Sequence, residues 1–351
     1  PIFLRLIEDL FPKYAKTTPP VIDAELKSKA LKVSKDRGLQ GDEAFCVKVV
    51  QFQELLDVRH SVMLIGPGGC AKSTIWQTLV GCHNLGKDKR TCVAETVNPK
   101  SVTSDELYGY MTLAKDWKDG VLSIMMRGMY KNDRDLGFYE YQTYKWVVLD
   151  GDIDAVWIES MNTVMDDNKV LTLVSNERIP LTPAMRMVFE IDSLANATPA
   201  TVSRAGILFI NATDIGYKPY IESWIQRRPE GAERERWPTL FQRYVDVIFE
   251  QMRKGYEDII PVRQISKITT LCNLLQSILD PIEEDTVKTP EMLESVFIWA
   301  CIWAFGGPLS SSKSGNSRKA FSSMWMDTFQ FVKIPVKDDK TVFDYYYNIK
   351  S

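Results

Sequence analysis

Short apolar runs and longer amphipathic stretches alternate over the first part of the chain. Five runs are bounded by turn-forming or charged residues: His60–Gly66, Cys92–Val97, Lys145–Asp150, Met185–Asp192 and Gly206–Ile210. Continuous rather than alternating hydrophobicity is typical of strands in a parallel sheet that is buried on both faces. Apolar residues recur at helical spacing in Glu25–Arg37, Asp42–Leu56 and Thr74–Cys82. The pattern predicts an α/β fold with a five-stranded parallel sheet flanked by helices.

The strand pattern ends near Asp214, and the rest of the chain favours helices. Helical periodicity covers Pro219–Gln226, Thr239–Lys254, Val262–Leu279, Pro290–Phe305 and Ser317–Phe331. The Ser- and Gly-rich stretch from Ser310 to Ser317 is expected to be a mobile loop. We therefore divide the chain into a lead-in segment (1–25) with a short helix at Ile2–Phe11, a large α/β subdomain (26–213), a helical lid subdomain (214–334) and a linker to a following module (335–351).

The composition is that of an ordinary globular protein and argues against several classes of partner. Hydrophobic residues make up 45% of the chain, charged residues 25%, and the net charge is -3. A negative net charge argues against nucleic acid or an anionic membrane as the main partner. The longest apolar run, Val296–Phe305, is too short to cross a bilayer. The six cysteines are scattered without metal-ligand spacing, so we expect buried thiols rather than a zinc site.

A glycine-rich segment directly follows the first predicted strand and opens the helix after it. Its residues are Gly66, Pro67, Gly68, Gly69, Cys70, Ala71, Lys72, Ser73 and Thr74. Glycines let successive backbone N–H groups turn toward phosphate oxygens, and the helix N-terminus adds the positive end of its dipole. Lys72 is expected to reach the β- and γ-phosphates and the Ser73 hydroxyl to ligate Mg²⁺. The segment therefore predicts a P-loop that binds ATP or ADP with Mg²⁺.

Ala71 is the one departure from the P-loop pattern, because it stands where the last glycine belongs. An alanine adds a methyl group beside the phosphates and resists a positive φ angle. We expect nucleotide binding to survive this substitution in weakened or slowed form. A chance glycine-rich turn is the alternative, and the strand before it, the helix after it and Lys72-Ser73 in register all argue against that.

The third apolar run ends in Asp150, which is placed to hold Mg²⁺ through water. In ATPases of this class a glutamate usually follows this aspartate and polarises the attacking water, but here the next residue is Gly151. Glu159 reaches back to the site only with favourable geometry, and Asp152 and Asp154 are expected to cap the next helix. Loss of a positioned base costs about 10²–10⁴-fold in rate. We therefore predict a site that binds ATP and hydrolyses it poorly or not at all.

Arg204 lies between the fourth and fifth predicted strands, in Asn196-Ala-Thr-Pro-Ala-Thr-Val-Ser-Arg204. In a ring of modules, an arginine at this edge can contact the γ-phosphate held by the neighbouring module, where such a finger is worth about 10³–10⁵-fold in rate. An ordinary surface ion pair is the alternative. The residues alone favour neither interpretation.

Several stretches closely resemble the second AAA+ module of dynein heavy chains. They include Asp57-Val-Arg-His-Ser-Val-Met-Leu-Ile-Gly-Pro67, Asn98-Pro-Lys-Ser101, Glu106-Leu-Tyr-Gly109, Trp117-Lys-Asp-Gly120, Leu149-Asp-Gly-Asp-Ile-Asp154, Asp166-Asp-Asn-Lys-Val-Leu-Thr-Leu173, Asn176-Glu-Arg178 and Ala197-Thr-Pro-Ala-Thr-Val-Ser-Arg-Ala-Gly206. The resemblance covers nearly the whole chain and is strongest over residues 55–225. The residues from Thr198 to Gly206, together with Ile207-Leu-Phe-Ile210 and the Pro219–Trp224 stretch, look more like an axonemal, outer-arm type than a cytoplasmic one.

The resemblance implies a module of a microtubule motor that holds ATP as a structural nucleotide and lacks the catalytic glutamate. It implies that Arg204 acts on the ATP of the first module, and that the segments around Glu106–Gly120 and Leu171–Met185 contact the swinging linker. Asp192 or Ser193 would take the sensor-1 position. Val21 and Ile22 would pack against the adenine, and Arg318 is a weak candidate for sensor 2.

The resemblance also implies partners and a location. The partners would be the neighbouring AAA+ modules of the same heavy chain, the linker domain, and microtubules through the whole motor, with no nucleic acid and no membrane. The location would be the cytoplasm, the cytoskeleton and the axoneme of a cilium or flagellum. Two other interpretations stay open: an independently active P-loop ATPase or remodelling enzyme, and a nucleotide-free ring spacer.

Overall fold

The computed structural model describes residues 22–86, 91–131, 144–253, 255–282, 288–312, 315–332, 334, 337 and 340–346. The chain divides into two compact units. One contains the residues up to Asp36 together with Gly41–Asp214, and the other contains Arg37–Gln40 together with Ile215 onward. The predicted helix at Ile2–Phe11 lies outside the described residues, and the assignment of separate roles to the four predicted segments stays a prediction.

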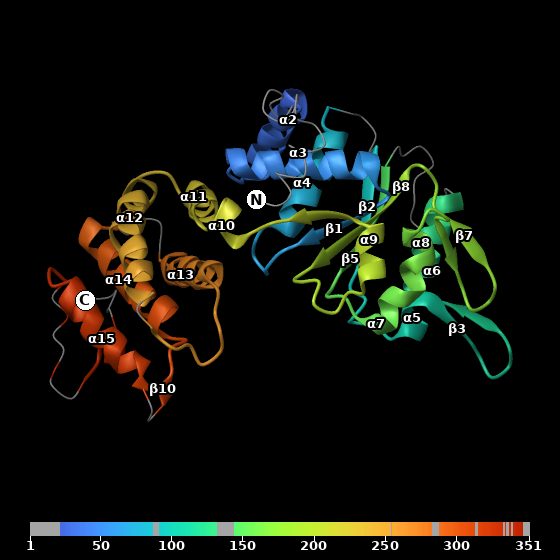
Figure 1. Cartoon of the computed structure of the whole chain (residues 1–351). Coiled ribbons are helices and arrows are strands. Elements are labelled where there is room, and N and C mark those ends of the chain that lie inside the picture. The colour runs from blue at the N-terminus through green and yellow to red at the C-terminus, as the bar shows by residue number, and fades with distance from the viewer. Residues whose placement is uncertain are drawn as a thin grey trace, which may run out of the picture. The chain divides into compact units, whose positions relative to one another are not determined.

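The first unit is built on a five-stranded parallel sheet (Figure 1). Its strands are β1 (Ser61–Ile65), β2 (Cys92–Val97), β5 (Tyr144–Asp150), β8 (Met185–Ile191) and β9 (Gly206–Phe209), in the spatial order β2-β5-β8-β1-β9. These are the five apolar runs of the sequence, so the predicted α/β fold is confirmed. In this order β1, which precedes the glycine-rich loop, lies between β8 and β9.

Successive side chains of the central strands point to opposite faces of the sheet. Trp146 of β5 packs edge-on against Phe52 at 5.8 Å between ring centroids, so this face is covered by the helices before and after β1. They are α2 (Ala24–Asp36), α3 (Glu43–Val58) and α4 (Lys72–Asn84), which pack on one another. Val147 and Leu149 face the other way, into a cluster with Leu122 and Met126 of α6 (Val121–Lys131).

The remaining elements of this unit are short, and the apolar pattern does not predict them. They are α5 (Ser104–Tyr108), β3 (Gly109–Met111), β4 (Trp117–Asp119), α7 (Ala155–Ile158), η1 (Glu159–Met161), α8 (Asn162–Met165), β6 (Val170–Thr172), β7 (Arg178–Pro180), α9 (Pro199–Arg204) and α10 (Ala212–Ile215). β3 and β4 form one antiparallel hairpin, and β6 and β7 form another. Both hairpins fall in the segments whose resemblance implies contact with a linker.

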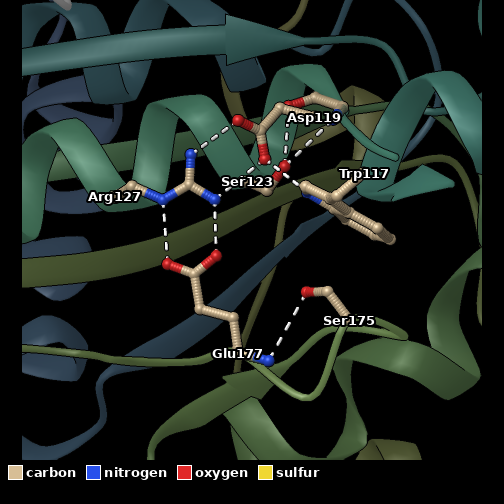
Figure 2. A network of polar contacts seen from close by, with 7 residues as sticks. Trp117, Asp119, Ser123, Arg127, Ser175 and Glu177 are labelled. Atoms are coloured by element: carbon tan, nitrogen blue, oxygen red, sulfur yellow. Dashed lines mark hydrogen bonds and ion pairs between the residues drawn. The ribbon is translucent and has the colours of Figure 1, made fainter. Parts of the chain in front are cut away.

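Arg127 of α6 joins the two hairpins (Figure 2). Its Nη1 and Nη2 atoms donate to Asp119, at the end of β4, at 2.9 and 2.8 Å. Its Nε and Nη2 atoms donate to Glu177, in the turn between β6 and β7, at 2.9 and 2.6 Å. The hydrogen bonds from Arg127 lower the pKa of both carboxyl groups and thereby favour their charged forms. One guanidinium group thus fixes both hairpins to α6.

Replacing Arg127 with alanine is expected to lower the free energy of unfolding by about 1–2 kcal/mol, because two paired carboxylates lose charge-assisted hydrogen bonds while remaining partly exposed to water. The folded-state pKa values of Asp119 and Glu177 are both lowered. The stabilisation by Arg127 is therefore present above the unfolded-state pKa values and is lost as the pH falls through the folded-state pKa values. The difference from wild type should therefore shrink below about pH 4. Urea unfolding at several pH values measures the loss, and amide hydrogen exchange locates it in the two hairpins.

A matched control is Arg178→Ala, which removes an exposed arginine from β7. Exposed substitutions of this kind usually change stability by less than about 0.5 kcal/mol. Equal losses for the two variants would contradict the assigned role of Arg127.

The second unit is helical around one aromatic-rich core. Its elements are α11 (Lys218–Arg227), α12 (Ala232–Met252), α13 (Gln264–Leu279), α14 (Pro290–Gly306), α15 (Ser317–Thr328), η2 (Val342–Asp344) and the short antiparallel pair β10 (Ser311–Ser312) and β11 (Gly315–Asn316). The predicted helical lid is therefore present. None of the described helices combines the length and the apolar character needed to cross a membrane.

Two details of the prediction for this unit are wrong. The predicted loop from Ser310 to Ser317 contains the β10–β11 pair. The helix predicted to begin at Thr239 begins seven residues earlier, at Ala232, and carries Pro238 inside it. Proline removes one backbone donor from a helix interior, whereas the adjacent Trp237 is fully buried in the core, and burial of its large apolar surface favours the helix.

Candidate functional site

The glycine-rich loop connects β1 to the first turn of α4. Gly66 begins it, and the N–H group of Gly66 donates to the carbonyl of Ile191 at 3.2 Å, which ties the loop to the end of β8. Cys70 is buried beneath the loop, and the exposed Gly68 and Gly69 lie on its outer side. All six cysteines of the chain are buried as thiols, as expected.

Two residues of the loop adopt left-handed backbone conformations. Gly69 has a φ of 81°, and Ala71 has a φ of 72° and a ψ of 23°. For a residue with a side chain this conformation costs roughly 1–2 kcal/mol. Ala71 also occupies the N-cap position of α4 and has no polar side-chain atom to cap the helix. The loop therefore keeps the turn geometry of an anion-binding nest in spite of the alanine.

Lys72 is folded back over the loop. Its Nζ atom donates to the carbonyl oxygens of Gly66 at 2.5 Å and Pro67 at 3.3 Å. An ammonium group at this place, beside the uncapped N-terminus of a helix, favours a polyphosphate. The residues present therefore fit the phosphates of a nucleotide.

Asp150 ends β5 and Gly151 follows it, at the same edge of the parallel sheet as the loop, with β8 between β5 and β1. Asp150 is exposed, whereas the five residues before it are buried. A Cβ atom built on Gly151 would lie 2.9 Å from Oδ1 of Asn98 and 3.2 Å from Cδ of Pro99. Asn98 follows β2, and its Oδ1 atom accepts a hydrogen bond from the Lys100 N–H group at 2.9 Å. The turn after β2 thus occupies the space that a side chain at position 151 would need.

Asp152, Asp154 and Glu159, the other acidic candidates, make different contacts. Asp154 accepts a hydrogen bond from the N–H group of Val156 and caps α7, as predicted. Asp152 does not: its Oδ1 atom accepts from the N–H group of Asp192 at 2.9 Å, so this carboxylate fixes the residue after β8. Glu159 is exposed on η1, and within the described residues no hydrogen bond or ion pair joins it to the loop or to Asp150.

Arg204 ends α9 and forms an ion pair with Asp166, the residue after α8. The pair is partly exposed, with side-chain exposures of 28% and 34%. The surface ion pair considered for Arg204 is therefore present in this chain. A side chain held by one partly exposed carboxylate can still exchange that partner for a phosphate, so the trans role of Arg204 stays a prediction.

The roles expected for Val21, Ile22 and Arg318 stay predictions. Val21 lies outside the described residues, and Ile22, just before α2, is exposed. Arg318 belongs to the helical unit, where its Nη2 atom donates to the carbonyl of Gly307 at 2.8 Å.

Glu190 lies beside the loop in β8 and was not among the site residues expected from the sequence. Oε2 of Glu190 accepts a hydrogen bond from the Ser73 hydroxyl at 2.7 Å, and Oε1 accepts one from Nε1 of Trp76. Burial raises the pKa of this carboxyl group against the effect of both hydrogen bonds, and the neighbouring Asp150 charge raises it further. A charged residue inside a continuous apolar strand, on the same face as Asp150, is the signal that could have found it.

Three family models match parts of the chain. Residues 61–205 match the AAA domain of the dynein-related subfamily, and residues 237–351 match the dynein heavy chain AAA lid domain. Residues 1–73 match the hydrolytic ATP binding site of the dynein motor region. That last match ends at Ser73 and does not include Asp150 or Gly151. Together these matches support nucleotide binding by the loop.

Curated relatives match over almost the whole chain. The chain is 41% identical over 98% of its length to the dynein beta chain of the flagellar outer arm from Chlamydomonas reinhardtii, of which it spans 7%. It is 44% identical over its full length to the ciliary dynein beta chain of Heliocidaris crassispina, of which it spans 8%. It is also 44% identical to the human dynein axonemal heavy chain 9 over 99% of its length. The chain therefore belongs to the dynein heavy-chain family, as an AAA module with the lid domain that follows it.

Proposed function

We propose that this chain is the second AAA+ module of an axonemal dynein heavy chain, and that it holds ATP or ADP with Mg²⁺ as a structural or regulatory nucleotide with little or no hydrolysis. Lys72 would bind the phosphates. Ser73 and, through water, Asp150 would hold the metal ion. Mg²⁺ would neutralise phosphate charge, while the backbone of the loop orients the phosphates.

One observation carries the absence of hydrolysis: the position after Asp150 is a glycine whose missing side chain would meet Oδ1 of Asn98 at 2.9 Å. A base at this position would polarise the attacking water, and its loss typically costs about 10²–10⁴-fold in rate. Of the neighbouring carboxylates, Asp152 accepts a hydrogen bond from the N–H group of Asp192 at the end of β8, and Glu190 is buried.

The proposed place in a motor ring rests on Arg204 and on the relatives. Arg204 would leave Asp166 and act on the ATP of the first module, while the β3–β4 and β6–β7 hairpins would contact the linker domain. The relatives named as ciliary, flagellar and axonemal suggest an axonemal location. Microtubules would be a partner only through the whole motor, because this chain spans less than a tenth of those relatives.

Two alternatives make different predictions. An independently active ATPase would need a residue that replaces the missing base. Within the part of the chain that the structure describes, Glu159 forms no hydrogen bond or ion pair with the loop or Asp150, and Asp152 accepts a hydrogen bond from the N–H group of Asp192. A nucleotide-free spacer would have no need for the loop geometry around Lys72, which is retained together with Asp150.

Calorimetric titration of MgATP and MgADP, with phosphate release followed in parallel, tests the proposal. Lys72→Ala should weaken binding of both nucleotides about 10- to 100-fold, because charge-assisted hydrogen bonds to the phosphates are lost. The wild type should release little or no phosphate. Lys118→Ala, an exposed lysine on β4, is the matched control and should bind as the wild type does. Turnover at ordinary ATPase rates would favour the first alternative, and no binding by the wild type would favour the second.

A further inference from the structure

Glu190 is a carboxylate placed almost entirely out of contact with water behind the phosphate loop. Its side chain is 4% exposed, whereas Asp150 and Ser73 are exposed. Glu190 and Asp150 are paired in register on the adjacent parallel strands β8 and β5. Paired residues on neighbouring strands project from the same face of a sheet. Both carboxylates therefore project from the same face of the sheet, with Asp150 exposed and Glu190 buried against α4.

The contacts of Glu190 come from one face of α4. Ser73 and Trp76 are three residues apart on this helix and lie on the same side of it. The Ser73 hydroxyl donates to Oε2 at 2.7 Å and the indole N–H group donates to Oε1, so both oxygens of the carboxylate are engaged. Within the described part of the chain, no lysine, arginine or histidine forms an ion pair with Glu190, although Lys72 is near enough to influence its charge.

A buried carboxylate without a cationic partner is costly, and it is retained where another group compensates for it. A divalent cation bound at Ser73 and Asp150 would supply that charge. The direction of the Ser73 hydrogen bond is also suited to metal binding. Because the hydroxyl proton is directed to Glu190, the lone pairs of the Ser73 Oγ atom are left for a ligand on the exposed side.

We propose that Glu190 is a positioning residue of the metal half of this nucleotide site: its carboxylate orients the Ser73 hydroxyl toward a divalent cation and adds a buried negative charge behind that cation. Trp76 holds the second carboxylate oxygen and keeps the group in place. This inference rests on the proposed binding of a nucleotide with Mg²⁺, and it assigns to Glu190 an effect on the metal rather than on the phosphates.

The test compares affinity for ADP with Mg²⁺ and with EDTA, measured by calorimetry on the wild type, Glu190→Gln and Trp76→Phe. Partners of metal ligands typically contribute 10- to 100-fold to metal affinity. The readout is the dissociation constant of ADP in EDTA divided by that in Mg²⁺. In Glu190→Gln this ratio should therefore fall at least about tenfold, because the charge of the side chain is lost while its shape is kept. Trp76→Phe removes the other hydrogen bond of Glu190 but keeps its charge beside Ser73, so its ratio should fall less than that of Glu190→Gln. Electron paramagnetic resonance of bound Mn²⁺ in the presence of ADP gives a second readout, which should show weaker Mn²⁺ binding in Glu190→Gln.

If Glu190 had only a structural role, replacing it would weaken ADP binding equally with and without the metal. An unchanged ratio in Glu190→Gln would therefore overturn the inference. If that variant does not fold, Glu190→Asp decides, because it keeps the charge but withdraws it from Ser73. Its ratio should then be intermediate, and a ratio within about twofold of wild type would overturn the inference. A wild type that binds no nucleotide in either buffer would instead overturn the proposed function, and the inference with it.

Discussion

Gly66→Ala is expected to lower the free energy of unfolding of the α/β unit by more than about 3 kcal/mol and to abolish nucleotide binding. A Cβ atom at this position would lie 2.2 Å from the carbonyl oxygen of Ile210 and 2.8 Å from Sγ of Cys70. The Ile210 carbonyl cannot retreat easily, because the N–H group of the same residue donates to Ile65 of β1 at 2.8 Å. The added methyl group must therefore separate β9 from β1 or displace the start of the phosphate loop.

Gly206→Ala is the matched control for this substitution. Gly206 lies in β9 beside β1, and a Cβ atom there would have its nearest neighbour, a side-chain carbon of Arg59, at an ordinary 3.4 Å. Urea unfolding and calorimetric titration of ADP should show a large loss for Gly66→Ala and little change for Gly206→Ala. Nucleotide binding by a stably folded Gly66→Ala variant would show that the close approach to Ile210 does not constrain the loop.

Gly151→Glu, which restores the residue type expected after Asp150, should not restore hydrolysis. The new side chain would meet Asn98, whose Oδ1 atom is held by the Lys100 N–H group. Forcing a side chain into such a space typically costs about 1–3 kcal/mol. We therefore expect a loss of stability in this range and phosphate release no higher than in the wild type, because the carboxylate is displaced from the position where a base would act.

A double-mutant cycle with Asn98→Ala separates the steric effect from other effects. Gly151→Ala carries the Cβ atom without the charge and should show part of the same loss of stability. Combining Gly151→Glu with Asn98→Ala should recover about 1 kcal/mol relative to the sum of the single changes, because the two residues compete for one space. Additive losses, or ordinary ATPase turnover by Gly151→Glu alone, would refute the conflict with Asn98.

The sheet and the loop could be predicted because they depend on local sequence signals. Each of the five strands is a continuous apolar run, and the glycine-rich loop lies between a strand and a helix, where phosphate-binding loops occur. The β3–β4 and β6–β7 hairpins could not be predicted in this way. Strands of three residues are too short to establish an alternation, and Arg127 holds the two hairpins through contacts between distant parts of the chain.

The contacts in the site that the sequence did not predict also join parts of the chain that are distant in sequence. The partners of Glu190 and Arg204 come from other elements, so their contacts depend on the order of strands in space rather than on the neighbouring residues. Asp152 was expected to cap a helix because it lies just before one, but the parallel pairing of β5 with β8 brings the residue after β8 to it. The obstruction at Gly151 likewise depends on the turn after β2, which is adjacent to β5 only in the folded sheet.

The link through Arg127 also has a mechanical consequence. The turns of both hairpins expose an apolar side chain, Leu113 after β3 and Val174 after β6. Because one planar guanidinium group holds the base of the first hairpin and the turn of the second (Figure 2), a load applied to either turn has a short path to the other that avoids the central sheet. The two hairpins are therefore coupled through α6 by four hydrogen bonds from one side chain, in addition to the apolar cluster that Leu171, Ile179 and Trp117 share with that helix.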